Sequence, residues 1–193
     1  METYVIAGLG NPGPKYQWTR HNAGFLFLDR LAHLQNISIT RSSFSGLAGE
    51  WKYRDNRLVL LKPQTFMNLS GRAVMQALQF YKLPLSHLIV AHDELDLPFG
   101  TVRLKQGGGH GGHNGLRSIM EQLGKGDFTR LRIGIGRPPH GDTVNYVLGN
   151  IPPAEMEIMP RVLDGGLDML ETMLDEGLPK AMSLYHNRNY LEG

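Results

Sequence analysis

The sequence predicts an α/β fold: a single domain over residues 1–193 with a twisted, mixed, largely parallel β-sheet covered by helices on both faces. Short apolar runs alternate with longer segments whose apolar residues recur at helical spacing. With 41% hydrophobic residues, a chain of this length can bury a substantial core in one domain. Polar residues also follow directly after several apolar runs, at the strand ends where α/β proteins place their sites.

The first elements follow from periodicity and turn chemistry. Residues 4–7 are a short apolar run, which is typical of a buried strand. Residues 22–35 carry apolar side chains every three or four positions and therefore predict an amphipathic helix. Residues 47–53 and 57–62 flank Asp55-Asn56, a pair that favours turns, so we expect a β-hairpin.

The middle of the chain repeats this alternation. Residues 71–81 predict a helix, residues 88–91 a buried strand and residues 100–105 a further strand. Residues 116–123 predict an amphipathic helix, and residues 129–135 a strand.

The last part of the chain is expected to be a loop followed by two helices. Residues 137–150 are rich in Pro, Gly and His and predict a loop that acts as a lid. Helices are expected at about residues 153–176 and 179–187.

The most informative segment is the glycine-rich stretch over residues 106–115. It has five glycines within residues 107–113. Because ordering glycine costs more backbone entropy than ordering other residues, and ordinary connections need fewer glycines, this stretch favours a functional site over a plain connection. His110, His113 and Asn114 supply polar groups, and the loop leads into a helix N-terminus that favours anions and polarised oxygens. The alternative is a simple connection capped by Asn114.

A second glycine motif, Gly8 to Gly13, has the G-x-G-x-x-G spacing of dinucleotide-binding proteins. Its context argues against that function, because Pro12 and Pro14 prolong the turn and Asp29 falls inside a helical pattern. A tight turn is the better interpretation, from which Asn11 can point its amide into a site.

The candidate chemistry is general base catalysis. Asp93 ends an apolar strand, where a buried carboxylate needs a partner, and His21 stands at the start of the first helix. An aspartate that orients a histidine supports proton abstraction. The sequence has no cysteine and no G-x-S-x-G motif, so water is the simplest nucleophile.

A metal site is the alternative chemistry, with His92, Asp93, His110 and His113 around zinc. No spacing in the sequence fixes a complete ligand set, and we expect no metal or cofactor. The amides of Asn11, Asn68 and Asn114 are instead suited to holding an amide or ester carbonyl.

Charge is unevenly distributed along the chain. Residues 1–150 have 17 Lys and Arg against 10 Asp and Glu, whereas residues 151–178 have seven acidic residues and one basic residue. A basic body makes a polyanionic partner plausible.

Four blocks together resemble the bacterial peptidyl-tRNA hydrolases. They are Gly8 to Gly13 with Thr19-Arg-His-Asn-Ala-Gly24, Lys62 to Gly71, His92-Asp-Glu-Leu-Asp-Leu-Pro98, and Gly107 to Gly115. The blocks span nearly the whole chain in the same order. The resemblance implies a metal-independent monomer that cleaves the ester between a peptide and the 3′ ribose of tRNA, recycling tRNA from prematurely released peptidyl-tRNA.

The resemblance also implies roles for individual residues. His21 is similar to the catalytic base, Asp93 to its stabilising carboxylate, and Asn11 to the residue that separates N-blocked from free aminoacyl esters. The other positions match residues that hold the substrate, its tRNA end or the tRNA phosphates: Tyr16, Phe66, Met67, Asn68, His113, Asn114, Arg103, Lys105 and Arg132.

Three other functions are compatible with parts of the sequence: a non-catalytic RNA-binding module, a nucleotide-dependent oxidoreductase and a zinc hydrolase. The N-terminus has no signal-peptide pattern and no apolar run reaches membrane-spanning length, so we expect a cytoplasmic protein without membrane contact.

Overall fold

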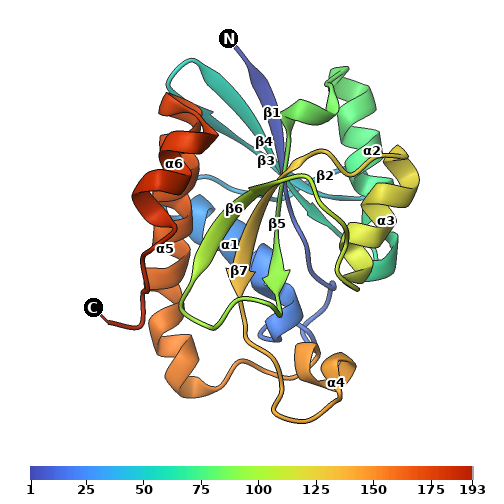
Figure 1. The fold of residues 1–193 in the computed structure, drawn as a ribbon. Coiled ribbons are helices and arrows are strands. Elements are labelled where there is room, and N and C mark those ends of the chain that lie inside the picture. Colours follow the sequence, from blue (N-terminus) through green and yellow to red (C-terminus); the bar gives the residue numbers. More distant parts are fainter. Residues whose placement is uncertain (193) are drawn as a thin grey trace.

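The computed structural model describes residues 1–192, and within them one seven-stranded sheet has the order β2-β3-β4-β1-β5-β7-β6 (Figure 1). Strand β1 pairs in parallel with β4 and β5, and β5 pairs in parallel with β7. The β2–β3, β3–β4 and β6–β7 pairs are antiparallel, so the expected mixed sheet is confirmed. The strands are β1 (Thr3–Gly8), β2 (Arg41–Ser43), β3 (Gly46–Tyr53), β4 (Asn56–Pro63), β5 (Leu88–Glu94), β6 (Val102–Gln106) and β7 (Thr129–Gly134).

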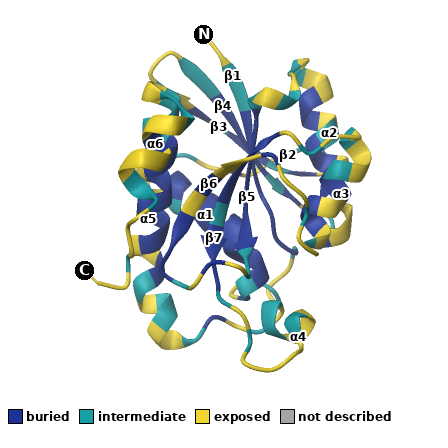
Figure 2. Ribbon diagram, in the orientation of Figure 1, coloured by how far each residue is buried: buried dark blue, intermediate teal, exposed yellow. Residues whose placement is uncertain are grey.

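Helices cover both faces of the sheet, as the sequence predicts. On one face α1 and α5 close a core around Phe27 and Leu131, and on the other α2 and α3 close a core around Leu61 and Phe128. Figure 2 shows the buried strands between these helical layers. The α-helices are α1 (Ala23–Gln35), α2 (Ser70–Tyr81), α3 (Asn114–Leu123), α4 (Thr143–Val147), α5 (Pro153–Glu176) and α6 (Leu178–Tyr185). None of the helices in residues 1–192 has the length and apolar character needed to cross a membrane.

Three local expectations need correction. The segment 137–150 is not a plain loop, because it contains the short helix α4, capped by the Asp142 carboxylate on the amide of Asn145. Strand β2 was not predicted, since its three residues are polar and lie at the edge of the sheet. The cap of α3 is His113 and not Asn114, which is the first residue of the helix.

The strand order brings the polar strand ends together. Strands β4, β1 and β5 are parallel neighbours, so their carboxyl ends meet at one edge of the sheet. Asn11 follows β1, Met67 follows β4, and Asp93 is the next-to-last residue of β5. Helix α4 lies beyond this edge, at the bottom of Figure 1.

Two glycines let α1 approach the sheet closely enough to present the residues before it at this edge. A Cβ on Gly8 would overlap the main chain of Gly24, and a Cβ on Gly24 would overlap the main chains of Leu9 and Ala91. The 3-10 helix η1 (Arg20–Asn22), which carries His21, leads directly into α1. This contact explains Gly8 of the G-x-G-x-x-G motif without a dinucleotide. The chain after β1 forms turns until η1 and does not open the helix that a dinucleotide site needs.

We expect Gly24→Ala to lower the free energy of unfolding by about 1–3 kcal/mol, the usual cost of overpacking. An alanine inside a helix is ordinarily stabilising relative to glycine, so the clash reverses the normal sign. Denaturant unfolding measures the change, with Gly109→Ala as a control because a Cβ there meets no atom within 4 Å. Unchanged or increased stability of Gly24→Ala would contradict this packing argument.

Candidate active site

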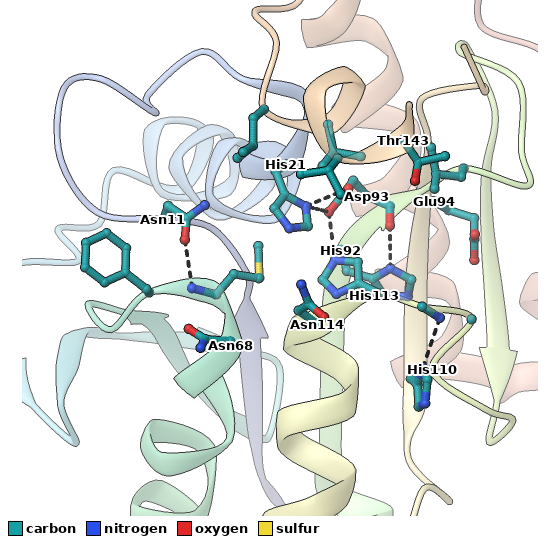
Figure 3. A pocket seen from close by; sticks show the side chains of 18 residues that line it. Asn11, His21, Asn68, His92, Asp93, Glu94, His110, His113, Asn114 and Thr143 are labelled. Atoms are coloured by element: carbon teal, nitrogen blue, oxygen red, sulfur yellow. Dashed lines mark hydrogen bonds and ion pairs between the residues drawn. The ribbon is translucent and has the colours of Figure 1, made fainter. Parts of the chain in front are cut away.

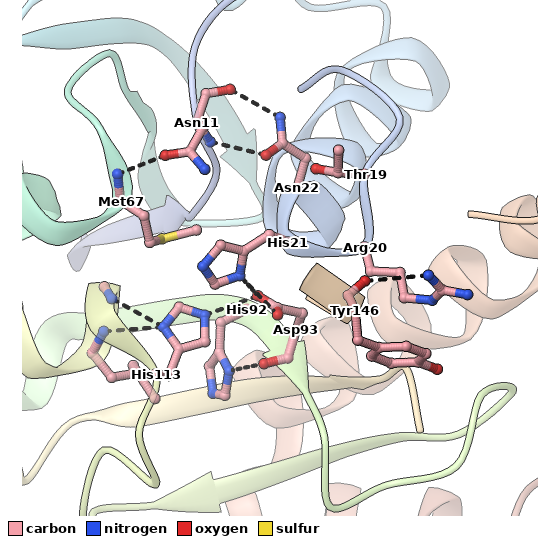
Figure 4. Close-up of polar contacts among 12 residues, drawn as sticks. Asn11, Thr19, Arg20, His21, Asn22, Met67, His92, Asp93, His113 and Tyr146 are labelled. Carbon is pink, nitrogen blue, oxygen red and sulfur yellow. Dashed lines mark hydrogen bonds and ion pairs between the residues drawn. The ribbon is translucent and has the colours of Figure 1, made fainter. Parts of the chain in front are cut away.

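The centre of the site is the carboxylate of Asp93, which contacts two histidines. His21 Nδ1 lies 2.9 Å from Oδ2 of Asp93, and His113 Nε2 lies 2.8 Å from Oδ1. The three side chains come from η1, β5 and the residue before α3, so three elements converge on one carboxylate (Figure 4). Asp93 is 3% exposed, and an ionised carboxylate buried this deeply requires such hydrogen-bond donors.

Backbone donors determine which nitrogen of His113 carries its proton. The amides of Gly115 and Leu116, at the N-terminus of α3, donate to His113 Nδ1 over 3.1 and 3.3 Å. Nδ1 is therefore an acceptor, and the neutral ring must donate to Asp93 through Nε2–H. The N-cap residue of α3 thus also donates a hydrogen bond to the Asp93 carboxylate.

For His21, the same carboxylate selects the opposite tautomer. The Nδ1 atom of His21 faces both oxygens of Asp93, at 3.1 and 2.9 Å, so it carries the proton and donates it. This leaves the Nε2 lone pair of His21 available to accept a proton. Aspartate-oriented imidazoles of this kind act as general bases.

The pKa values of these groups reflect this arrangement. Burial alone lowers the pKa of His21, but the charge of Asp93 and its hydrogen bond outweigh burial and raise the pKa above its ordinary value. Burial would raise the pKa of Asp93, yet His21 and His113 together hold it well below its usual range. At neutral pH Asp93 is ionised.

His92, next in sequence to Asp93, is a buried histidine that lines both this site and the neighbouring basic cavity. It is 2% exposed and donates from Nδ1 to the main-chain oxygen of Asp93 over 2.8 Å. Burial and the neighbouring His113 lower the pKa of His92 to about 4, so it is neutral at physiological pH. Its ring packs edge-on against His113, with centroids 5.2 Å apart.

Asn11 is fixed by its neighbours so that one donor remains available. Its Oδ1 accepts from the amide of Met67 over 2.7 Å, which identifies the other side-chain atom as the NH₂ group. Asn22 holds the main chain of Asn11 on both sides, with contacts of 2.9 and 3.0 Å. Within residues 1–192 the Nδ2 group of Asn11 has no protein partner, and Asn11 lines the cavity described next.

A cavity of about 320 Å³ lies over these groups (Figure 3). Eight of the predicted site residues line it: Asn11, His21, Phe66, Met67, Asn68, Asp93, His113 and Asn114. Tyr16 does not line this cavity, but its ring packs edge-on against Phe66 with centroids 6.4 Å apart. The sequence therefore located eight of the 18 residues that line the cavity.

The wall formed by α4 was not predicted residue by residue. Val144, Val147 and Leu148 line the cavity. Because Val144 is also 65% exposed, this segment offers apolar surface to a bound molecule. Arg20 holds this segment beside His21: its guanidinium lies 4.0 Å from the centroid of the Tyr146 ring and donates to the Tyr146 main-chain oxygen. The sequence signal was weak, because a five-residue helix has too little periodicity to detect.

The predicted basic residues lie beside the cavity, on the edge strand β6 and its neighbour β7. Arg103 of β6 is directly opposite Arg132 of β7, and Lys105 is opposite Arg130. Because residues two apart on a strand share a face, all four side chains lie on the same face of the sheet. A second cavity of about 220 Å³ is lined by Lys105, Arg130 and Arg132. Arg130 was missed, although the Arg-Leu-Arg pattern of a strand places it on the same face as Arg132.

The metal alternative placed His92 and His110 with Asp93 and His113, but the structure gathers a different set. The ligand atoms that lie within 4.8 Å of one another belong to His21, Asp93 and His113. Both histidine nitrogens in this set are assigned as N–H donors to the carboxylate, so a cation there would have to displace both protons. The geometry is that of a hydrogen-bonded base.

Comparisons with known proteins agree with one another. The family model described as "Peptidyl-tRNA hydrolase" matches residues 5–192. Curated proteins named peptidyl-tRNA hydrolase from Pelobacter propionicus and Trichlorobacter lovleyi are 80% and 74% identical, each over the full length of both chains. A crystal structure of peptidyl-tRNA hydrolase from Acinetobacter baumannii superposes with a TM-score of 0.90 at 40% identity, covering 97% of this chain and 96% of that one.

We expect Asp93→Asn to lower the pKa of His21, because burial would then act without the opposing carboxylate charge. NMR titration of the imidazole signals measures the shift. Glu94→Gln is the matched control, since it removes an adjacent carboxylate that contacts Arg132 and leaves the Asp93–His21 bond in place. A His21 pKa that stays the same or rises in Asp93→Asn would show that Asp93 does not set it.

Proposed function

The chain belongs to the peptidyl-tRNA hydrolase family, and from this membership we propose how its site hydrolyses the ester that joins a peptide to tRNA. The observation that carries the mechanism is the bond of 2.9 Å between His21 Nδ1 and Asp93. Nε2 of His21 takes a proton from a water molecule, which attacks the ester carbonyl. Asp93 stabilises the imidazolium that forms, and the proton then passes to the leaving 3′ oxygen of the ribose.

The asparagines orient the peptide part of the substrate. Asn11 Nδ2 is a donor of fixed direction, because the Met67 amide holds its Oδ1. We assign it to a main-chain carbonyl of the peptide, a contact that an N-blocked aminoacyl group offers and a free one lacks. Asn68 and Asn114 line the same cavity and bind the ester carbonyl and the attacking water. These preorganised amides make a metal unnecessary for an ester that is already activated.

The tRNA part binds along the basic edge of the sheet. Lys105, Arg132 and Arg103 contact phosphates, which gives affinity that depends on salt and little on sequence. Phe66, 58% exposed, and the adjacent Tyr16 provide aromatic faces for bases of the single-stranded CCA end. The acceptor stem then lies across β6 and β7.

The biological role that follows is the recycling of tRNA from prematurely released peptidyl-tRNA. We propose that residues 1–193 perform it as one domain, as a monomer and in the cytoplasm, where this substrate arises. Each assignment of a residue to peptide or tRNA can be tested separately.

We expect His21→Ala to lower kcat by about 10²–10⁴-fold, the usual contribution of a general base. Release of free tRNA from N-acetyl-aminoacyl-tRNA measures it, while tRNA binding should persist because the basic edge is intact. In the unmodified chain the rate should rise with pH through the raised pKa of His21, since only the neutral ring accepts a proton. His33→Ala, an exposed histidine on α1, is the control. Wild-type turnover by His21→Ala would overturn the base assignment, and binding without any cleavage by the unmodified chain would favour a non-catalytic RNA-binding module.

We expect Lys105→Ala to weaken tRNA binding and to reduce the slope of log affinity against log salt by about 1, the effect of one lost phosphate contact. Binding titrations at several salt concentrations measure both quantities. Lys180→Ala removes an equal charge from α6, away from the two cavities, and should leave the slope unchanged. Equal effects of the two variants would mean that the interaction is only with overall charge.

A further inference from the structure

Arg130 on β7 is an unusual arginine because it is buried without a carboxylate. It is 2% exposed, and none of the ion pairs found within residues 1–192 includes it. Glu94 of β5 pairs instead with Arg132 over 2.9 Å. A buried cation costs free energy unless other groups solvate it, so the partners of Arg130 indicate its purpose.

Those partners are main-chain carbonyls of two separate segments. Nη2 donates to the oxygens of Gly108 and Gly126 over 2.6 and 2.9 Å, and Nη1 donates to the oxygen of Gly109. Gly108 and Gly109 belong to the glycine-rich loop between β6 and α3, whereas Gly126 lies in the connection between α3 and β7. The guanidinium also lies over the Phe128 ring, 4.5 Å from its centroid. A guanidinium presents its donors to these carbonyls in a fixed plane, whereas a lysine ammonium is a compact charge on a flexible stem and would hold them less rigidly.

The glycine-rich loop needs such an anchor. Gly107, Gly108, Gly111 and Gly112 all have positive φ, between 57° and 103°. Glycine adopts these angles readily but has the largest conformational entropy to lose, and this stretch has few side chains with which to pack. The loop must nevertheless be ordered, because it delivers His113 to Asp93.

The same loop separates the two cavities. His110 and Gly111 line both the cavity over Asp93 and the basic cavity of Lys105 and Arg132. A loop that moved would change the shape of both cavities and the bond between His113 and Asp93.

We propose that Arg130 is a positioning residue that anchors the Gly107–Gly112 loop, so that His113 is held on the Asp93 carboxylate. The inference rests on the proposed function for its effect on turnover, but its effect on the loop is independent of that function. Arg130 touches neither the reacting atoms nor Asp93 in this account. Although Arg130 also lines the basic cavity, its guanidinium donates to the backbone carbonyls of the loop.

The test uses Arg130→Lys and Arg130→Met in the full chain, with Arg117→Lys as the matched control. Arg117 is an exposed residue of α3 and stands four positions after His113. Arg130→Lys preserves the charge and removes the fork, so it separates anchoring from electrostatics. Three quantities are measured: amide hydrogen exchange at residues 107–116, kcat and KM on N-acetyl-aminoacyl-tRNA, and the salt slope of tRNA binding.

In Arg130→Lys we expect amide exchange in the loop and at the Gly115 and Leu116 amides to rise by about tenfold or more, the effect of losing charge-assisted hydrogen bonds. We expect kcat to fall by about tenfold or more as the Asp93–His113 geometry loosens, while the salt slope stays unchanged. Exchange in β1, β4 and β5 should remain that of the unmodified chain. Arg117→Lys should change none of these quantities.

Loop exchange that is unchanged in Arg130→Lys would overturn the proposal. Faster loop exchange with wild-type kcat would also overturn it, because the loop would then be anchored for stability alone. A reduced salt slope in Arg130→Met, together with an unchanged kcat, would assign Arg130 to phosphate binding instead. Where Arg130→Met does not fold, Arg130→Lys decides the matter alone. Failure of the general-base assignment would appear in His21→Ala and would leave the loop-exchange result standing.

Discussion

The carboxylate of Asp93 is the group on which the site depends. It accepts hydrogen bonds from His21 and His113, and its bond to His21 fixes the tautomer of that ring as well as its position. Because the carboxylate is buried, it remains charged only while these donors are in place, and the donors are oriented only while it remains charged. A single side chain therefore couples η1, β5 and the start of α3 into one proton-accepting unit.

The fold supplies the close approaches that this unit requires. The parallel order β4-β1-β5 places three strand ends side by side, and the contact of Gly24 with Leu9 and Ala91 lets α1 begin directly over them. On the opposite side, the N-terminus of α3 presents two amides to His113 and so sets which of its nitrogens faces Asp93. The same strand ends hold Asn11 against Met67, which leaves one amide donor directed at the substrate cavity. The close glycine contact and the backbone amides thus determine where the polar side chains lie and which of their atoms donate hydrogen bonds.

Much of this was predictable from the sequence, for identifiable reasons. Long periodic segments predicted α1 and α5 close to their observed bounds, and the Asp55-Asn56 turn pair predicted the β3–β4 hairpin. The apolar run before Asp93 located the central carboxylate. The pairing of His21 with Asp93 was predicted because a buried carboxylate needs a donor, and the two side chains do meet. Local patterns could not show that His113 caps α3 and also bonds Asp93, since that requires knowing where the loop folds back. Helix α4 is held by the contact of its Tyr146 with Arg20, and Arg130 is buried by its bonds to the loop carbonyls. Such tertiary contacts leave no periodic signal in the sequence.

The most direct test of this account is the tautomer of His21, read from the ¹⁵N chemical shifts of its two ring nitrogens in the unmodified chain. The measurement is made above the pKa of His21, where the ring is neutral. The account predicts a proton on Nδ1, donated to Asp93, and a free lone pair on Nε2 that faces the cavity. A neutral ring with its proton on Nε2 would contradict it, because His21 would then have no base to offer the attacking water.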